Sequence, residues 1–168
     1  IHGVLGRSEQ KVAWPRWLPV AVFAVLRAFN DHLGGRFGRR EFAPAIKEII
    51  STWQGVCDID VQIQPEVKKL VSKDSRLSMC VNEIVKEAVS NAVRHGDART
   101  AQVSLRIADD GVLDLRVAND GREPKLGGRR GLGGELFDEL TVDWSLDFDS
   151  ATDQTILSAR LPFSTAQA

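Results

Sequence analysis

One stretch of the sequence, residues 82–96, places a carboxylate and an amide where both could act on the same ligand. Glu87 and Asn91 are four positions apart, so on an α-helix their side chains lie next to each other on one face. A carboxylate can orient or deprotonate a nucleophile, and an amide oxygen is a hard ligand that suits Mg²⁺. The pair therefore indicates a site where a metal-bound ligand meets an acid or a base.

Two glycine-containing segments follow this stretch, in the order that a nucleotide site would need. Residues 117–121 end in Asn-Asp-Gly, and residues 127–134 read GGRRGLGG. Glycines let backbone N–H groups approach oxyanions closely, a helix beginning just beyond adds its dipole, and Arg129 or Arg130 would add charge-assisted contacts. The P-loop pattern G-x-x-x-x-G-K-[ST] is absent from the sequence, which excludes that class of nucleotide-binding protein.

Hydrophobic periodicity predicts the elements that must position these residues. The helix with Glu87 and Asn91 is expected to run from a cap at Asp74 to Gly96, with an apolar stripe towards a core and a polar edge towards a pocket. Residues 120–134 are expected to be a mobile loop. The remaining elements are expected as helices over 41–53, 65–72 (helical or irregular) and 136–140, and as strands over 56–63, 101–107, 112–118, 142–148 and 155–161.

This order of elements predicts an α+β fold. We expect a two-layer sandwich of a mixed, mostly antiparallel sheet with helices on one face, preceded by one or two helices. The hairpin over 101–118 has a good turn signal at Asp109-Asp110-Gly111.

Composition narrows the classes of function. The chain has 168 residues and a net charge of −1, so no global field attracts nucleic acid or an anionic membrane. Cys57 and Cys80 have no metal-ligand spacing, which favours reduced thiols in a cytoplasmic protein. The apolar segment 17–29 is shorter than the roughly 20 residues of a membrane span and contains Arg27. We expect a buried or dimer-facing helix there, the alternatives being an interfacial helix or the remnant of a longer membrane segment.

Residues from about 77 to 163 resemble the ATP-binding domain of the superfamily that unites gyrase, heat-shock chaperone, histidine kinase and mismatch-repair ATPases. The motifs are most similar to those of bacterial sensor histidine kinases. They read EAVSNAVRHG at 87–96, VANDG at 117–121, GGRRGLGG at 127–134 and QTILSARLP at 154–162. The resemblance implies a Bergerat-type fold, the cofactors ATP and Mg²⁺, and transfer of the γ-phosphate to a histidine in two-component signal transduction.

The first motif implies roles for four side chains. By the resemblance, Glu87 orients or activates the attacking group, and Asn91 is the Mg²⁺ ligand that ties the metal to the triphosphate. Arg94 and His95 fall where the family places phosphate-contacting side chains. Metal and cationic donors would neutralise the charge of the nucleotide.

The second motif departs from the family pattern. The family has an acidic residue two positions before a glycine, and this residue reads the adenine amino group. Here Asn119 occupies that position and the acid is Asp120, so both are candidates together with Gly121. An amide oxygen can accept the hydrogen bond, but an amide has no charge and can flip.

The last two motifs complete the implied nucleotide site. The third resembles the lid over the phosphates, which implies that Arg130, Gly131, Leu132 and Gly133 contact the nucleotide. Thr155 matches a threonine of the family's last strand, which lies near the adenine.

The implied partners are a response regulator or another phosphoacceptor protein. The phosphoacceptor segment is expected to be absent, because prolines follow His2 closely and His32 fits a surface or cap position better. Residues 1–40 are expected to be an amino-terminal helical segment, a dimerisation or linker remnant, and 41–168 the ATP-binding kinase domain. The full-length protein is expected to be a homodimer in the cytoplasm or the cytoplasmic portion of a membrane sensor, with no membrane insertion by this segment and no nucleic acid as partner.

Three other functions remain open on the sequence. An anti-sigma-factor-like serine kinase would share the fold and the order of motifs without a helical hairpin. A nucleotide-sensing module without turnover would fit the change at Asn119. A dimerisation module would retain the motifs only as vestiges.

Overall fold

A computed structural model describes residues 42–124 and 132–163 of the chain. The expected amino-terminal helix, His2, His32 and the domain boundary near residue 40 therefore lie outside the described residues. No helix within these two ranges is long and apolar enough to cross a membrane.

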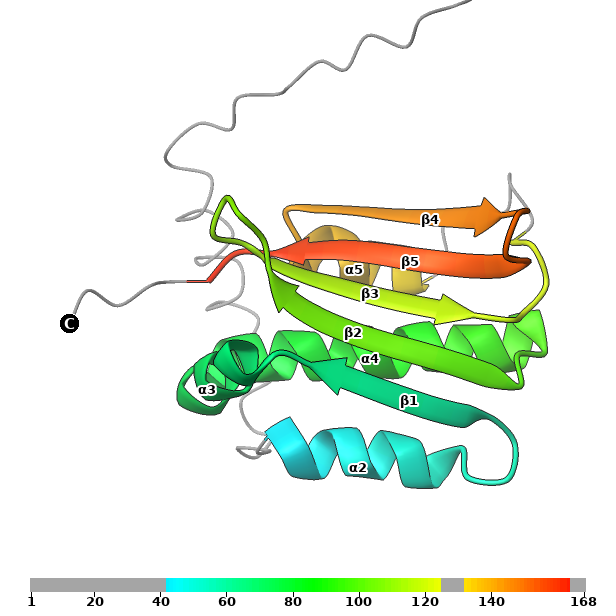
Figure 1. Ribbon diagram of the computed structural model, residues 1–168, viewed down its shortest axis with the longest axis horizontal. Helices are drawn as coiled ribbons and strands as arrows, with labels where there is room; N and C mark the ends of the chain where they lie inside the picture. The colour runs from blue at the N-terminus through cyan, green and yellow to red at the C-terminus, as the bar shows by residue number, and fades with distance from the viewer. Residues whose placement is uncertain (1–41, 125–131, 164–168) are drawn as a thin grey trace, which may run out of the picture.

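The described chain contains both helices and strands (Figure 1). In order, the elements are α2 (Phe42–Thr52), β1 (Asp58–Ile63), α3 (Pro65–Lys73), α4 (Ser75–Gly96), β2 (Thr100–Ile107), β3 (Leu113–Asn119), α5 (Leu132–Leu140), β4 (Asp143–Asp149) and β5 (Gln154–Leu161).

The strands form one five-stranded sheet in the order β1-β2-β3-β5-β4. Strand β1 pairs with β2 in parallel, and all the other neighbouring strands of this sheet are antiparallel. Helices α4 and α5 lie behind the sheet in Figure 1, and the face towards the viewer is not covered by a described helix. The predicted two-layer α+β sandwich with a mixed, mostly antiparallel sheet is confirmed.

The core lies between α4 and the covered face of the sheet. Val81 and Ile84 of α4 are fully buried, as are Leu105 of β2 and Leu115 and Val117 of β3. Alternate residues of β5 are buried, as the period of two requires for a strand with one covered face. The predicted apolar stripe of α4 is thus the surface that anchors this helix to the sheet.

The long helix begins where the sequence predicts. Asp74 caps it, because one carboxylate oxygen accepts the backbone N–H groups of Arg76 and Leu77, both at 3.0 Å. The helix ends at Gly96, and Asp97 follows in the left-handed conformation with φ of 55°.

Helix α5 differs from the prediction, because it begins at Leu132 rather than at Leu136. The sequence predicts a loop through Gly134, since glycine is a poor helix former. Phe137 and Leu140 pack into the core from this helix. Tertiary packing outweighs the low propensity of the two glycines and extends the helix by a turn.

The uncovered face of the sheet is polar. Asp114 of β3 lies between arginines on the two neighbouring strands, 3.2 Å from Arg106 and 3.5 Å from Arg160. The two edge strands of the described sheet carry exposed aspartates: Asp58 and Asp60, two positions apart on β1, and Asp143 and Asp147, four positions apart on β4.

Candidate functional site

Glu87 and Asn91 form a hydrogen-bonded pair on α4. The Nδ2 group of Asn91 donates to Oε1 of Glu87 at 3.0 Å, and both side chains are half-buried. Because an ionised carboxylate only accepts hydrogen bonds, the amide nitrogen of Asn91 must face it. The amide oxygen of Asn91 is therefore turned away from Glu87, and it accepts no hydrogen bond from the residues that the structure describes. The pair presents a neutral oxygen donor beside a carboxylate.

Asn119 lies at the end of β3, next to Thr155 of β5 in the antiparallel register. Its Nδ2 donates to the backbone carbonyl of Thr155 at 3.2 Å, and its Oδ1 accepts the backbone N–H of Gly121 at 2.9 Å. A flipped amide would oppose oxygen to oxygen and N–H to N–H, so these two partners fix one orientation. The side chain is only 6% exposed. The freedom to flip that the sequence suggests is thus removed by the fold.

Position 121 requires a glycine because there is no room for a side chain. A Cβ at this position would lie 2.6 Å from Oδ1 of Asn119, 3.1 Å from the carbonyl oxygen of Gly96 and 3.2 Å from the Cα of Gly96. Real Cβ atoms essentially never come as close as 2.6 Å to another atom, and Gly121 does not have a positive φ. The close approach of two backbones, from the end of α4 and the segment after β3, explains this glycine.

Unlike the neighbouring Asn119, Asp120 binds backbone groups at the start of β2. Its carboxylate accepts the backbone N–H groups of Arg99 and Thr100, at 2.8 and 2.9 Å, where β2 begins. Burial acts to raise the pKa of Asp120, but the hydrogen bonds from Thr100 and Arg99 outweigh it and hold the pKa below its ordinary value of 3.8. The carboxylate of Asp120 is thus engaged in fixing the start of β2.

Arg122 is a residue of this region that the sequence analysis missed. Its backbone N–H donates to the carbonyl of Gly96 at 2.8 Å, and its own carbonyl accepts the hydroxyl of Thr155 at 3.2 Å. Its guanidinium lies 2.5 Å from the carboxylate of Asp97. Asp97 and Arg122 are 25 positions apart and belong to none of the four motifs, so the sequence carries no signal for this pair.

The side chains of Arg94 and His95 at the end of α4 are exposed. The guanidinium carbon of Arg94 lies 5.8 Å from the ring centroid of Trp53, a cation–π contact with the residue that follows α2. His95 occupies the last turn of α4.

The expected lid is described only in part. Arg129, Arg130 and Gly131 lie outside the described residues, whereas Leu132 and Gly133 form the first turn of α5. Of the expected site, the structure brings together Asn119, Gly121 and Thr155 through the contacts above, and the end of α4 at Gly96 meets them there. Asn91 precedes Gly96 by five residues, about 7.5 Å along the axis of the same helix.

The two cysteines are free and buried. Burial raises the pKa of the Cys80 thiol to about 12, and burial together with the charges of Asp120 and Asp58 raises the pKa of Cys57. Both thiols are therefore protonated at neutral pH, and neither is a ready nucleophile.

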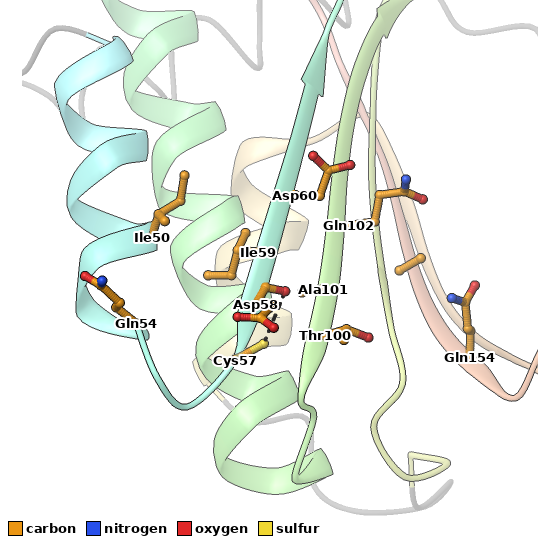
Figure 2. A pocket seen from close by; sticks show the side chains of 11 residues that line it. Ile50, Gln54, Cys57, Asp58, Ile59, Asp60, Thr100, Ala101, Gln102 and Gln154 are labelled. Atoms are coloured by element: carbon orange, nitrogen blue, oxygen red, sulfur yellow. Dashed lines mark hydrogen bonds between the residues drawn. The ribbon is translucent and has the colours of Figure 1, made fainter.

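A hollow of about 460 Å³ lies on another part of the molecule (Figure 2). Asp60, Gln102 and Gln154 line it, together with Ile50 of α2 and Gln54, which follows that helix. Gln154 adjoins Thr155 on β5, and successive strand residues point to opposite faces of a sheet. The hollow thus includes the polar face of the sheet and contains none of the site residues expected from the sequence.

Comparison with known proteins gives no match by sequence: no model of a protein family matches the chain, and no curated protein matches it either. Solved structures do match it. The histidine kinase domain of the blue-light-activated histidine kinase EL346 from Erythrobacter litoralis superposes with a TM-score of 0.55 at 18% identity, over 86% of this chain and 72% of that one.

A second solved structure, the ATP-binding domain of PrrB from Mycobacterium tuberculosis, has a TM-score of 0.50 at 19% identity. The superposition covers 75% of this chain and 96% of that one. The fold is that of a histidine kinase ATP-binding domain. The resemblance expected from the sequence is therefore confirmed at the level of the fold. This chain spans about half, 48%, of a longer structure of EL346.

We predict that Gly121→Ala lowers the free energy of unfolding by about 1–3 kcal/mol, since the added Cβ overpacks the site against Asn119. It should also shift the NMR signals of the Asn119 side-chain amide. The control is Gly111→Ala, where φ is 77° and a Cβ meets nothing within 4 Å. That variant should cost about 1–2 kcal/mol through backbone strain and leave the Asn119 signals in place. An Asn119 signal that Gly121→Ala does not move would contradict the steric explanation.

We predict that the carboxylate charge of Asp120 stabilises the fold in a pH-dependent manner. Because the pKa is lowered in the folded state, the contribution is present above the unfolded value near 3.8 and disappears as the pH falls through the lower folded value. Asp120→Asn keeps an oxygen acceptor but has no charge. The difference in free energy of unfolding between wild type and this variant, measured with urea from pH 7 to pH 3, should shrink in acid. A difference that stays constant over this range would refute the prediction.

Proposed function

We propose that this chain is the Mg-ATP-binding catalytic domain of a two-component sensor histidine kinase, which transfers the γ-phosphate to a histidine. The observation that carries the proposal is the Glu87–Asn91 pair, in which the carboxylate turns the amide oxygen of Asn91 outwards. The helix that bears the pair ends against the buried Asn119–Thr155 contact. One end of the site thus suits a metal-bound triphosphate and the other suits a base.

The donor set at Asn91 fits Mg²⁺. This ion prefers oxygen ligands and is commonly held by one or two protein groups, with phosphate oxygens and waters completing its octahedron. A neutral amide oxygen without a hydrogen bond from the described residues is such a ligand. When bound, Mg²⁺ would neutralise charge on the triphosphate. Arg94 and His95, and Arg130 with Gly131, Leu132 and Gly133 of the lid, are proposed to contact the phosphates as the resemblance implies.

Asn119 fits the base-reading role better than Asp120. Its Oδ1 has a second lone pair after accepting from Gly121, and this lone pair can accept a hydrogen bond from the adenine amino group. The carboxylate of Asp120 already binds two backbone amides of β2. We therefore propose that Asn119, with Gly121 and Thr155 beside it, holds the adenine, and that Asp120 supports this end of the sheet.

Glu87 is proposed to orient or deprotonate the histidine that attacks the γ-phosphate. Its carboxylate is held by Asn91, so the base and the proposed metal ligand have a fixed relation to each other. The histidine would come from a separate segment or subunit of a homodimeric protein, and a response regulator would receive the phosphate. This assignment places the reaction in the cytoplasm.

We predict that Asn91→Ala weakens the binding of Mg-ATP by about 10- to 100-fold or more, because loss of even indirect support for a metal costs this much. Isothermal titration calorimetry with ATP, with and without Mg²⁺, measures the effect. Asn82→Ala is the control, since Asn82 is a buried asparagine on the same helix with no role in the proposed site. Equal Mg²⁺-dependent affinities for Asn91→Ala and wild type would argue against the metal assignment.

We predict that Glu87→Gln slows ADP formation by about 10²–10⁴-fold while the affinity for Mg-ATP changes little, because general-base catalysis contributes a factor of this size. Glu83→Gln, one turn earlier on the same helix, is the matched control and should retain the wild-type rate. Phosphate transferred from labelled ATP to a histidine-bearing segment, within the full-length protein or supplied separately, should be acid-labile, as phosphohistidine is. Acid-stable label would instead support a serine kinase, and binding without any ADP formation would support a nucleotide sensor.

A further inference from the structure

We propose that Arg122 is a positioning residue that sets the distance between the metal-binding and base-binding ends of the site. The inference depends on the proposed function, because it concerns the same nucleotide. It assigns a role to a side chain that lies outside all four sequence motifs and makes no claim that Arg122 contacts the nucleotide itself.

The main chain of Arg122 joins two elements. Its N–H donates to the carbonyl of Gly96, the last residue of α4, at 2.8 Å. Its carbonyl accepts the hydroxyl of Thr155 on β5 at 3.2 Å. The residue therefore bridges the helix that carries Asn91 and the strand beside Asn119.

The side chain of Arg122 joins the same helix end a second time. Its guanidinium pairs with Asp97, the left-handed residue that caps α4 by donating its own N–H to the carbonyl of Ala92. The side chains of Arg122 and Asp97 are 77% and 58% exposed. An exposed pair contributes little to overall stability, so the effect that matters here is on geometry.

The backbones of Gly96 and Gly121 meet with no side chain between them, so no side-chain rearrangement can compensate for a change in their spacing. Gly96 and Gly121 approach so closely that a Cβ on Gly96 would touch the Cα of Gly121 at 3.4 Å. Asn91 is fixed to the helix by its backbone, and Asn119 is fixed to the sheet by two hydrogen bonds. Weakening the Arg122–Asp97 pair at the junction thus allows the span between Asn91 and Asn119 to vary.

The direction in which Asp97→Asn changes the affinity for Mg-ATP distinguishes a positioning role from a purely electrostatic effect. Asp97→Asn removes a negative charge from the end of the helix that would face a triphosphate, and this alone would strengthen the binding of the anion. Positioning predicts the opposite result, a loss of affinity. Direct contact of Arg122 with phosphate also fails to predict a loss on changing Asp97, because the arginine remains.

The test compares Mg-ATP with adenosine, which fills only the base-binding end. Asp97→Asn and Arg122→Ala should each weaken Mg-ATP about two- to fivefold, the range expected for an exposed ion pair, and should leave adenosine binding unchanged. The charge-exchanged variant Asp97→Arg with Arg122→Asp should restore Mg-ATP affinity to within about twofold of wild type. Asp109→Asn, in the hairpin turn between β2 and β3, is the control for the loss of one charge.

Several outcomes would overturn the inference while wild type binds Mg-ATP. These are tighter or unchanged binding by Asp97→Asn, failure of the charge-exchanged variant to recover, and equal losses for adenosine and Mg-ATP, which would indicate a merely structural role. If wild type binds adenosine but shows no Mg²⁺-dependent binding of ATP, the proposed function itself fails and the positioning role fails with it.

Discussion

The contact between Gly96 and Gly121 is the constraint on which the candidate site depends. Helix α4 is held against the sheet by its apolar stripe, and this contact fixes how closely its last turn approaches the end of β3. Several hydrogen bonds surround this contact. The Asn119 amide bonds to the N–H of Gly121 and the carbonyl of Thr155, and the backbone of Arg122 bonds to the carbonyl of Gly96 and the hydroxyl of Thr155. The internal distances of a site assembled from a helix and two strands thus depend on the close approach of two residues without side chains.

The hydrophobic periods of the sequence were sufficient to predict the fold. The stripe of α4, the cap at Asp74 and the turn at Gly111 are local signals, and the structure reproduces each of them. The early start of α5 could not be predicted, because it depends on the burial of Phe137 and Leu140 in a core formed by distant segments. The Glu87–Asn91 hydrogen bond could be anticipated from spacing, whereas the Asp97–Arg122 pair requires knowledge of how two remote turns meet.

The amide of Asn119 suits its buried, hydrogen-bonded surroundings better than a carboxylate would. A carboxylate here would face the Thr155 carbonyl with oxygen against oxygen in a position that is almost closed to water. Burial and repulsion would both oppose its ionisation. The asparagine avoids this cost, since it donates to the carbonyl and accepts from Gly121 without carrying a charge. Asparagine in place of the family's acidic residue therefore suits a buried side chain of fixed orientation, which in the proposed function binds the adenine.

The aspartates on β1 and β4 have a consequence for how copies of this domain behave in solution. Both strands border the described sheet, and an unpaired strand border can recruit a strand from another molecule into a growing assembly. Two copies that approached border to border would bring rows of negative charge together at short range. Their mutual repulsion disfavours such association, so the charges on the edge strands of the described sheet oppose edge-to-edge aggregation.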